Sequence, residues 1–567
     1  MPLKTSIGKQ SFARVIEEQC FYVDKTHFIK EWWEYGDDVT LITRPRRFGK
    51  TLNMSMLEAF FSLEYAGRND LFEGLSIWED AEYQKLQGTY PVIALSFAEI
   101  KETTYTGMLK QFWRIIRNLY RKYDFIPEDN AVSLLRKKEE VCAGTAEEFI
   151  PRPVDLSGAL HDLSLYMEEY YGKKVIILLD EYDTPMQEAY VSGYWNEMID
   201  FMRGLFNSTF KTNPALYRAV MTGITRVSRE SIFSDLNNLE VVTTTSAKYA
   251  AAFGFTEKEV FDALDMQGLS DRKEDVRRWY DGFTFGNVPD IYNPWSIINY
   301  LQKSAFSPYW ANTSANSLAG TLIREGNPEV KMAMENLLSG GTLVAELDEQ
   351  TVFEQLRNDR NAIWSLLLAE GYLTIVNLEQ DSWGEWHYEL KLTNHEVQIM
   401  FSKMISGWFQ SGAGGYNQFL RALLDGNLEE MNAYMNQVAF STFSYFDTGS
   451  GSSGFGEPER FYHGFVLGLM VELRTSYRIT SNRESGFGRY DILLEPLEKD
   501  RDAIIIEFKV FNPKKESTLG DTVEAALCQI REKKYGAGLT AKGIAPERIR
   551  CYGFAFQGKS VLIGFCN

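Results

Sequence analysis

Short, continuous apolar runs alternate with longer amphipathic stretches over the first half of the chain. The apolar runs contain no charged residue and lie at positions 39–43, 92–97, 175–179 and 219–222. Runs of this kind are typical of strands in a parallel sheet that helices cover on both faces. The stretches between them, such as 51–63 and 108–122, have the spacing of helices. This alternation predicts an α/β fold.

The pattern changes near residue 256, where helical spacing becomes dominant. Helices are predicted, for example, over residues 257–263, 294–301, 330–338 and 354–370. A stretch rich in Gly and Ser at 448–456 is typical of a flexible linker. Beyond it the pattern predicts a helix, two strands, a helix and a strand. We therefore expect an α/β domain at 1–255, a mainly helical domain at 256–447 and a second α/β domain at 457–567.

The charge of the chain narrows the choice of partners. The 567 residues carry a net charge of −19, which argues against a protein coated with nucleic acid, since phosphate binding needs clustered Lys and Arg. The charge is uneven, however. Residues 457–567 contain 17 Lys and Arg against 15 Asp and Glu, a net of +2, and the rest of the chain carries −21. The C-terminal segment is therefore the better candidate for contact with DNA or RNA.

Cysteines and apolar stretches bear on the compartment. The five cysteines have no C-x-x-C spacing, which argues against a zinc ribbon or a disulfide framework, and their small number fits a reducing environment. The N-terminus lacks the apolar core of a signal peptide. No uncharged apolar stretch approaches the roughly 18 residues of a membrane span. We predict a soluble, cytoplasmic protein with no membrane partner.

A candidate phosphate-binding loop follows the first apolar run. Its sequence is Arg44-Pro45-Arg46-Arg47-Phe48-Gly49-Lys50-Thr51, and a helix is predicted to start at its end. Gly49 would let the backbone approach phosphate oxygens, Lys50 would reach the β- and γ-phosphates, and the Thr51 hydroxyl would bind Mg²⁺. Arg46 and Arg47 add positive charge for a triphosphate. Phe48 is counted with the loop as a nucleotide-binding position.

The loop motif is incomplete, because Arg44 stands at the position of its first Gly. Alone, the motif fits a plain helix start with a solvated basic turn equally well. The apolar run at 175–179 changes this balance, because Asp180 and Glu181 follow it. Asp180 would hold Mg²⁺ and Glu181 would polarise an attacking water, and two acids at the end of a buried strand are costly without a cation. Together the motifs predict an ATP site.

A third strand end carries a polar residue and then arginines. The run at 219–222 ends in Thr222 and leads to Arg226 and Arg229. Thr222 would sense the γ-phosphate, and Arg226 would stabilise the transferred charge, in cis or from a neighbouring subunit. A surface turn with two solvated arginines is an equally good interpretation. By analogy with other ATPases, a neighbour's arginine would imply a homo-oligomer.

Two acids and a lysine form a candidate nuclease site near the C-terminus. Asp491 lies near the start of one predicted strand, and Glu507 and Lys509 follow the apolar run at 503–506. Because side chains two residues apart share a face of a strand, Glu507 and Lys509 point the same way. Pairing of the two strands would bring Asp491 near Glu507, so that both hold a divalent cation while Lys509 orients water. An upstream acid, either Glu459 or Glu472, could complete the metal site.

The alternative interpretation of this segment, without a function, is two acids at a sheet edge that form salt bridges with a lysine. Function is favoured by the strongly apolar strand before the acid and by the helix after it. That helix carries polar residues that could face a nucleic-acid backbone, namely Gln529, Lys533, Lys534 and Tyr535.

The motifs resemble a known family. The segments Phe21–Thr26, Arg44–Thr51 and Leu179–Asp183 resemble the AAA-ATPase-like family of bacterial proteins, and Tyr292–Ser296 and Tyr309–Ser314 resemble motifs from its middle region. The C-terminal segments that resemble the PD-(D/E)XK nuclease superfamily are Phe461–Phe465, Ser481–Gly486 and Gly488–Asp491. The resemblance implies a P-loop NTPase parallel sheet, a helical middle region and a C-terminal restriction-endonuclease-like α/β domain.

The resemblance also implies residue roles and a function. It assigns nucleotide and Mg²⁺ roles to Lys50, Thr51, Asp180 and Glu181, and nuclease roles to Asp491, Glu507 and Lys509. We expect a Mg²⁺-dependent ATP hydrolase coupled to a nuclease domain that uses Mg²⁺ or Mn²⁺, in mobile elements or phage defence. The alternative is a nucleotide-dependent switch or binding module, whose nuclease-like domain binds nucleic acid or protein without cutting it.

Overall fold

The computed structural model of the chain divides into two compact units. The first contains residues 1–319 and 344–397, and the second contains residues 320–343 and 398–567. The structure describes residues 3–5, 7–126, 151–225, 232–233, 236–311, 319–320, 322–323, 328–338, 340–347, 360–410, 416–442, 466, 470, 473, 476–481, 484–485, 488–489, 491–498, 501–558 and 560–566.

A five-stranded parallel sheet forms the centre of the first unit, in the order β2-β3-β4-β1-β5. Every neighbouring pair runs parallel. The strands are β1 (Val39–Thr43), β2 (Val92–Ser96), β3 (Val175–Asp180), β4 (Leu216–Gly223) and β5 (Leu239–Val242). All residues of β1 and β3 are buried, because helices cover both faces. The predicted α/β class is confirmed, and β5 is a strand that the apolar pattern did not predict.

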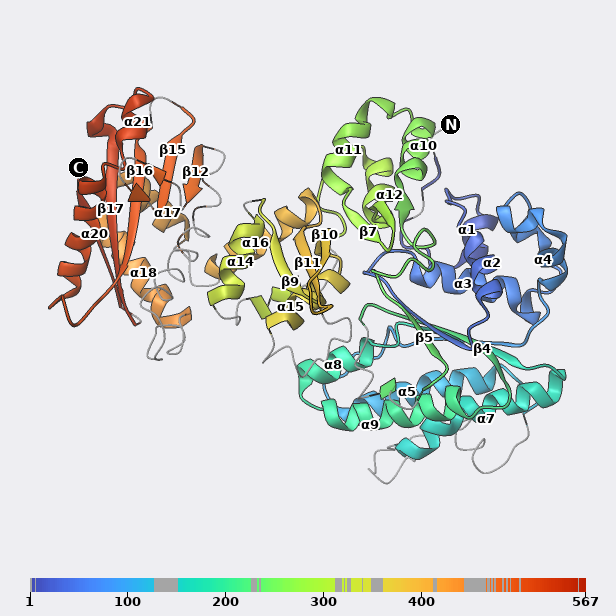
Figure 1. Ribbon diagram of the computed structural model, residues 1–567. Coiled ribbons are helices and arrows are strands. Elements are labelled where there is room, and N and C mark those ends of the chain that lie inside the picture. The colour runs from blue at the N-terminus through green and yellow to red at the C-terminus, as the bar shows by residue number, and fades with distance from the viewer. Residues whose placement is uncertain are drawn as a thin grey trace, which may run out of the picture. The chain divides into compact units, whose positions relative to one another are not determined.

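Two sets of helices, from different parts of the domain sequence, cover the two faces of this sheet (Figure 1). On one face lie α1 (Phe12–Glu17), α2 (His27–Tyr35) and α3 (Lys50–Phe61). Their aromatic side chains pack in one core with residues of β1, β3 and β4. On the other face lie α5 (Tyr105–Arg121), α7 (Pro153–Tyr171) and α9 (Trp195–Phe206). The shorter α4 (Ala81–Leu86) and α8 (Thr184–Ser192) complete this domain.

The rest of the first unit mixes helices with short antiparallel strands. Its helices are α10 (Glu257–Gln267), α11 (Lys273–Tyr280), α12 (Pro294–Lys303) and α15 (Arg360–Ala369). One small sheet joins β6 (Phe255–Thr256), β8 (Val288–Tyr292) and β7 (Phe283–Phe285), and another joins β10 (Leu373–Gln380), β11 (Trp386–Leu392) and β9 (Leu343–Glu346). The helix α14 (Pro328–Leu338) matches the helix predicted over 330–338, whereas α16 (His395–Gln410) was not predicted; α14 and most of α16 belong to the second unit. The predicted linker at 448–456 lies outside the described residues.

The second unit is built on a mixed five-stranded sheet in the order β12-β15-β16-β17-β18. The strands are β12 (Tyr477–Ser481), β15 (Ile492–Pro496), β16 (Ala503–Val510), β17 (Ile549–Gln557) and β18 (Ser560–Cys566). Only β16 and β17 pair in parallel among these neighbours. The helices α20 (Leu519–Lys533) and α21 (Ala537–Ala541) pack on one face. A separate two-stranded ribbon joins β13 (Glu484–Ser485) and β14 (Gly488–Arg489).

Two helices from before the predicted linker cover the other face of this sheet. The sequence division places α17 (Tyr416–Asp425) and α18 (Leu428–Thr442) in the middle region. In the structure their apolar side chains share one core with β15, β16 and β17. The Tyr552 hydroxyl donates to the Leu423 carbonyl at 3.0 Å. The C-terminal sheet is thus packed between α20 on one face and α17 and α18 on the other.

Asparagine side chains of α18 pair with the edge of the sheet. The Asn432 amide donates to the Ile563 carbonyl at 3.0 Å and accepts from the Ile563 N–H at 2.8 Å. Asn436 makes the same pair of bonds with Val561, at 2.7 and 2.9 Å. The four-residue spacing of the asparagines on a helix matches the two-residue spacing of strand β18, because both steps cover about 6–7 Å.

None of the helices in the described ranges is long and apolar enough to cross a membrane.

Candidate functional site

A cavity of about 460 Å³ lies where β1 and β3 end in the parallel sheet. Binding crevices at this edge are a general property of open parallel α/β sheets. The lining residues that the sequence had singled out are Arg46, Arg47, Gly49, Lys50, Thr51 and Glu181. The cavity volume lies in the range of small-molecule sites.

The loop geometry around Gly49 explains why α3 begins there. Gly49 has φ +84° and caps the N-terminus of α3, and a left-handed conformation of this kind favours glycine. The next residue, Lys50, is buried and donates from Nζ to the carbonyls of Arg44 at 2.8 Å and Pro45 at 2.9 Å. Burial lowers the pKa of Lys50, and the nearby Glu181, Asp180 and Asp183 carboxylates oppose this shift.

Asp180 joins two threonine hydroxyls at the end of β3. Thr51 donates to Oδ2 of Asp180 at 2.6 Å, and Thr222 donates to Oδ1. Burial raises the pKa of Asp180, while these two hydrogen bonds lower it. Hydroxyl and carboxylate oxygens are the donors that Mg²⁺ prefers. The donor groups of Thr51 and Asp180 therefore fit a magnesium ion.

Glu181 faces the same cavity from a strained position. Its φ is +52°, in the left-handed region, and its side chain lines the cavity and accepts from Thr184 Oγ1 at 3.2 Å. Strain in a non-glycine residue persists only where the surrounding structure imposes it. The carboxylate thus lines the same cavity as Lys50 and Thr51.

Arg44 does not take part in the cavity, which explains the missing first glycine of the motif. Its guanidinium is buried and donates to the carbonyls of Thr43 at 2.9 Å and Thr243 at 2.6 Å. It also lies 4.9 Å from the Phe285 ring centroid. Burial lowers the pKa of Arg44 to about 9. The residue joins β1 to the segment after β5, a structural role.

The other predicted loop residues point in different directions. Arg46 lines the cavity and donates to Gln187 at 3.3 Å. Arg47, with φ +67°, lies over the Trp295 ring. Phe48 is buried against Phe283 and Phe285, so only its backbone is available to a ligand. Arg226 lies outside the described residues.

Sequence reasoning missed two residues that shape this site. The Tyr182 hydroxyl donates to the Thr225 carbonyl at 2.7 Å, and Asp183 accepts from the backbone N–H groups of Ile224 and Thr225, each at 2.9 Å. Both therefore hold the turn after Thr222 against the end of β3. The sequence shows that acids recur over Asp180–Asp183. Only the contacts in the structure show that Glu181 lines the cavity while Asp183 holds the turn.

The C-terminal acids lie on neighbouring strands. Ile492 pairs with Ile506 across β15 and β16, and continuing this register by one residue places Asp491 opposite Glu507. Asp491 Oδ2 accepts from the Phe508 N–H at 2.8 Å. Lys509 follows two residues after Glu507 on β16 and is partly exposed. The strand alternation therefore gives Glu507 and Lys509 the same face.

Helix α20 supplies further polar groups to Glu507, which is buried. Gln529 donates to Glu507 and also to the Tyr535 hydroxyl, the latter at 3.1 Å. Two glycines bring α20 close to the sheet. Gly553, which pairs with Glu507, would carry a Cβ only 2.9 Å from the Val523 carbonyl, and a Cβ on its partner Gly564 would lie 2.3 Å from the Val523 side chain.

Gly553→Ala should therefore destabilise the C-terminal unit by about 1–3 kcal/mol, the usual cost of overpacking. The added methyl group would push α20 outward and separate Gln529 from Glu507. Thermal unfolding measures the loss. Gly520→Ala is the matched control, because a Cβ there would meet only the Thr518 hydroxyl, at 3.4 Å, and Ala favours the helix. An unchanged melting temperature for Gly553→Ala would contradict this account of the close packing.

Few of the described side chains are placed to bind a metal ion beside Asp491 and Glu507. Among the described residues, no cluster of three or more His, Cys, Asp or Glu side chains is placed to hold a metal ion. Glu459 and Glu472, either of which was predicted as an additional ligand, lie outside the described residues. Asp491 and Glu507 still offer carboxylate oxygens on neighbouring strands, so the donor chemistry fits Mg²⁺ or Mn²⁺.

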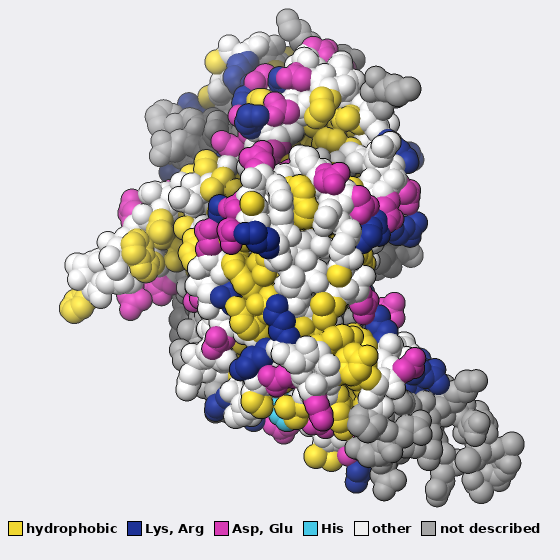
Figure 2. Space-filling model, turned by 90° about the vertical axis from the view of Figure 1, so that its right-hand side faces the viewer, with side chains coloured by type: hydrophobic (Ala, Val, Ile, Leu, Met, Phe, Trp, Pro, Cys, Tyr) yellow, Lys and Arg dark blue, Asp and Glu magenta, His cyan; other side chains and the backbone are white. Residues whose placement is uncertain are grey.

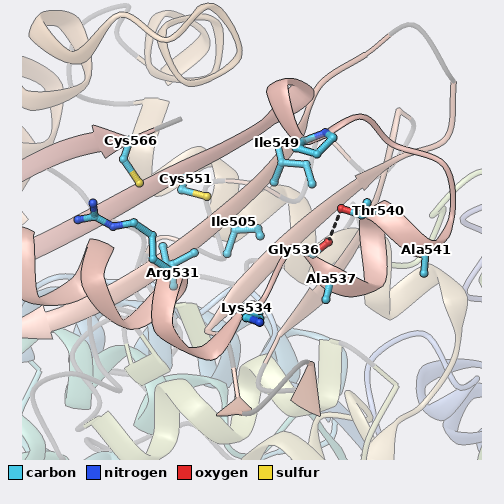
Figure 3. A pocket seen from close by; sticks show the side chains of 12 residues that line it. Ile505, Arg531, Lys534, Gly536, Ala537, Thr540, Ala541, Ile549, Cys551 and Cys566 are labelled. Atoms are coloured by element: carbon cyan, nitrogen blue, oxygen red, sulfur yellow. Dashed lines mark hydrogen bonds between the residues drawn. The ribbon is translucent and has the colours of Figure 1, made fainter.

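A second cavity, of about 530 Å³, lies in the same unit but contains none of the predicted acids (Figure 3). It is lined by residues of β16, α20, α21, β17 and β18, including Cys551 and Cys566, which pair across the last two strands. Burial raises the pKa of Cys551 to about 12. A thiol with so high a pKa is protonated at neutral pH and weakly nucleophilic.

The fold and these arrangements define an α/β protein with a candidate phosphate-binding loop in its parallel-sheet domain and two acids on neighbouring chain segments in its C-terminal domain. Comparison with known proteins agrees with this class. Residues 6–233 match the family model described as predicted AAA-ATPase, and residues 457–565 match the PD-(D/E)XK nuclease superfamily. Both matches confirm the resemblance inferred from the motifs.

One curated relative is similar over much of the chain. It is a protein of Azotobacter chroococcum mcd 1 described as "Uncharacterized protein in vnfD 5'region". The two are 28% identical over 410 residues, which make up 71% of this chain and 70% of the relative. The similarity therefore extends well beyond the AAA-ATPase-like region.

Proposed function

We propose that the chain binds and hydrolyses ATP with Mg²⁺. The observation that carries this proposal is that Lys50, Thr51 and Glu181 line one cavity. Behind them the buried Asp180 accepts from the Thr51 and Thr222 hydroxyls. Hydroxyl, carboxylate and ammonium groups in this arrangement match the needs of phosphoryl transfer to water. The AAA-ATPase-like match at residues 6–233 supports the same assignment.

Each residue would have a separate task in this reaction. Lys50 would donate to the β- and γ-phosphate oxygens, and the backbone N–H groups at the start of α3 would add donors. Thr51 and Asp180 would hold the metal, which when bound neutralises charge that develops on the phosphates. Glu181 would accept a hydrogen bond from the attacking water and orient it. Thr222 would keep Asp180 in place through its hydroxyl.

For the C-terminal domain we propose metal-dependent cleavage of DNA or RNA. Support comes from Asp491 opposite Glu507, from Lys509 on the same face, and from the superfamily match at 457–565. The acids would hold Mg²⁺ or Mn²⁺, and Lys509 would stabilise charge on the attacked phosphate. We further propose that ATP hydrolysis controls this cleavage and that the protein acts in mobile elements or phage defence.

Cleavage assays of the full chain test the proposal. Linear, nicked and branched DNA and single- and double-stranded RNA are incubated with Mg²⁺ or Mn²⁺, with and without ATP. Cleavage that requires ATP supports coupling, and cleavage without ATP supports two independent activities. A complete lack of cleavage on all substrates would refute the nuclease proposal, and a lack of phosphate release would refute the ATPase proposal.

Asp491→Asn should abolish metal-dependent cleavage and leave ATP hydrolysis unchanged. Asn keeps an acceptor for the Phe508 N–H but removes the charge that binds the cation, so the fold is retained. Loss of at least a hundredfold in rate is expected for a missing metal ligand, within the usual 10²–10³ range of electrostatic catalytic groups. Glu524→Gln is the control, because Glu524 is an exposed residue on the same helix as Gln529. Cleavage by Asp491→Asn at the wild-type rate would count against the assignment.

A second candidate function is binding of nucleic acid or protein without cleavage, under the control of bound nucleotide. The small excess of basic residues in the C-terminal segment is compatible with either function. Figure 2 looks onto the side of Figure 1 where the parallel-sheet domain lies, and on that face Lys and Arg side chains lie among Asp and Glu side chains, without a continuous basic stripe. Affinity that persists with no metal-dependent cleavage would favour this alternative. The cytoplasmic location and the homo-oligomer stay predictions.

A further inference from the structure

One wall of the nucleotide cavity comes from outside the phosphate-binding loop. Ile7, Pro294, Trp295 and Ile298 line the same cavity as Lys50. All four are apolar, and Trp295 and Ile298 are half-buried. A triphosphate has no use for such a surface, because its oxygens need N–H groups and cations. A flat aromatic base needs an apolar surface of this kind, since stacking on it removes apolar area from water.

The start of α12 is fixed to the phosphate-binding loop. Asn293 caps this helix by accepting from the Trp295 N–H at 2.9 Å, and its amide donates to the Arg46 carbonyl at 3.2 Å. One residue further, Ser296 donates to the buried Glu396 carboxylate at 2.9 Å. Trp295 therefore lies at a set position relative to the loop, although the two are almost 250 residues apart in sequence.

Arg47 links the aromatic wall to the phosphate end of the cavity. Its guanidinium carbon lies 4.4 Å from the Trp295 ring centroid, in the range of a cation–π contact. In this position the backbone of Arg47 is in the left-handed region, with φ +67°. Arg47 therefore adds positive charge within the loop and covers part of the indole. The apolar surface and the cationic side chains thus lie next to each other in one cavity.

We propose that Trp295, with Ile7 and Ile298, forms the surface on which the nucleotide base stacks. This inference rests on the proposed ATP site and adds the residues that recognise the base instead of the phosphates. Because stacking grows with ring area, a purine nucleotide should bind more tightly than a pyrimidine nucleotide with the same triphosphate. The Tyr292–Ser296 segment thus gains a role in the nucleotide site, distinct from that of the loop.

Calorimetric titration with two ligands separates base from phosphate recognition. ATP carries both groups, whereas inorganic tripolyphosphate carries only the phosphates. With Mg²⁺ present, Trp295→Ala should weaken ATP binding at least tenfold, which equals about 1.4 kcal/mol, and leave tripolyphosphate affinity within twofold of wild type. Trp295→Phe should recover most of the loss, because Phe keeps an aromatic face. CTP should bind wild type more weakly than ATP.

The controls distinguish the failure of this inference from that of the ATP site. Trp383→Ala removes a tryptophan that is 89% exposed and does not line the cavity, so both affinities should stay at wild-type values. Equal weakening of ATP and tripolyphosphate by Trp295→Ala would overturn base stacking and show that Trp295 only positions the loop. Unchanged ATP affinity in Trp295→Ala would also overturn it. Wild-type protein that binds neither ligand would overturn the ATP site itself, and the base-stacking surface with it.

Discussion

Lys50→Ala should abolish ATP hydrolysis while the protein stays folded. The substitution removes the ammonium that would neutralise the phosphates, and it removes the cation that lies near Glu181, Asp180 and Asp183. Loss of one preorganised electrostatic group usually lowers kcat by about 10²–10³-fold, and loss of binding through the same lysine adds to this. Phosphate release under saturating ATP measures the effect, and circular dichroism checks the fold.

A surface lysine provides the control for this experiment. Lys85→Ala removes a charge whose side chain is 72% exposed and whose ion pair with Glu82 is solvated, so hydrolysis should remain at the wild-type rate. Hydrolysis by Lys50→Ala within threefold of wild type would refute the assignment of the phosphate-binding loop. The same result would not bear on the proposed nuclease role of the C-terminal acids, because they belong to the other compact unit.

The second large effect concerns where the C-terminal domain begins. A fragment of residues 457–567, which starts with the superfamily match, should be insoluble, whereas a fragment of residues 412–567 should be soluble and fold. The shorter fragment lacks α17 and α18 and so exposes one apolar face of the sheet. The buried residues of that face include Ile492, Leu494, Ile504, Ile506 and Phe554.

The magnitude follows from the number of buried groups. Burial of each large apolar side chain contributes about 1.5–3 kcal/mol, and a domain is stable by only about 5–15 kcal/mol in total. Exposure of several such side chains is therefore enough to unfold the fragment. Expression, size-exclusion chromatography and thermal unfolding of both fragments measure the difference. A soluble, cooperatively melting 457–567 fragment would contradict this prediction.

The parallel sheet and its loop could be predicted because their signals are local. Strands β1 and β3 are buried on both faces, so β1 carries no charged residue and β3 is apolar up to Asp180, and both runs are visible in the sequence. Asp180 ends β3, and Lys50 and Thr51 follow β1 after the short loop at 44–49, which places them at one edge of the sheet. Asp491 and Glu507 could be brought together by the same reasoning, because neighbouring strands pair in a simple antiparallel register.

Other features depend on contacts between distant residues. The role of Arg44 depends on the Thr243 carbonyl and Phe285, and that of Trp295 depends on Arg47. The packing of α17 and α18 against the C-terminal sheet follows from the shape of apolar faces, which composition does not specify. The hairpin of β10 and β11 was missed because the apolar run at the start of β10, residues 373–376, is short and the rest of the strand is exposed and mostly polar.

The asparagine pairing of α18 with β18 also has a consequence for biosynthesis. A bare sheet edge presents unpaired N–H and C=O groups that can recruit another chain. On the ribosome, α18 emerges well before β18, because it precedes that strand in sequence. When the last strand is made, Asn432 and Asn436 are already available to occupy its edge. Once β18 is free to fold, the chain therefore carries its own protection against pairing along this edge with another newly made chain.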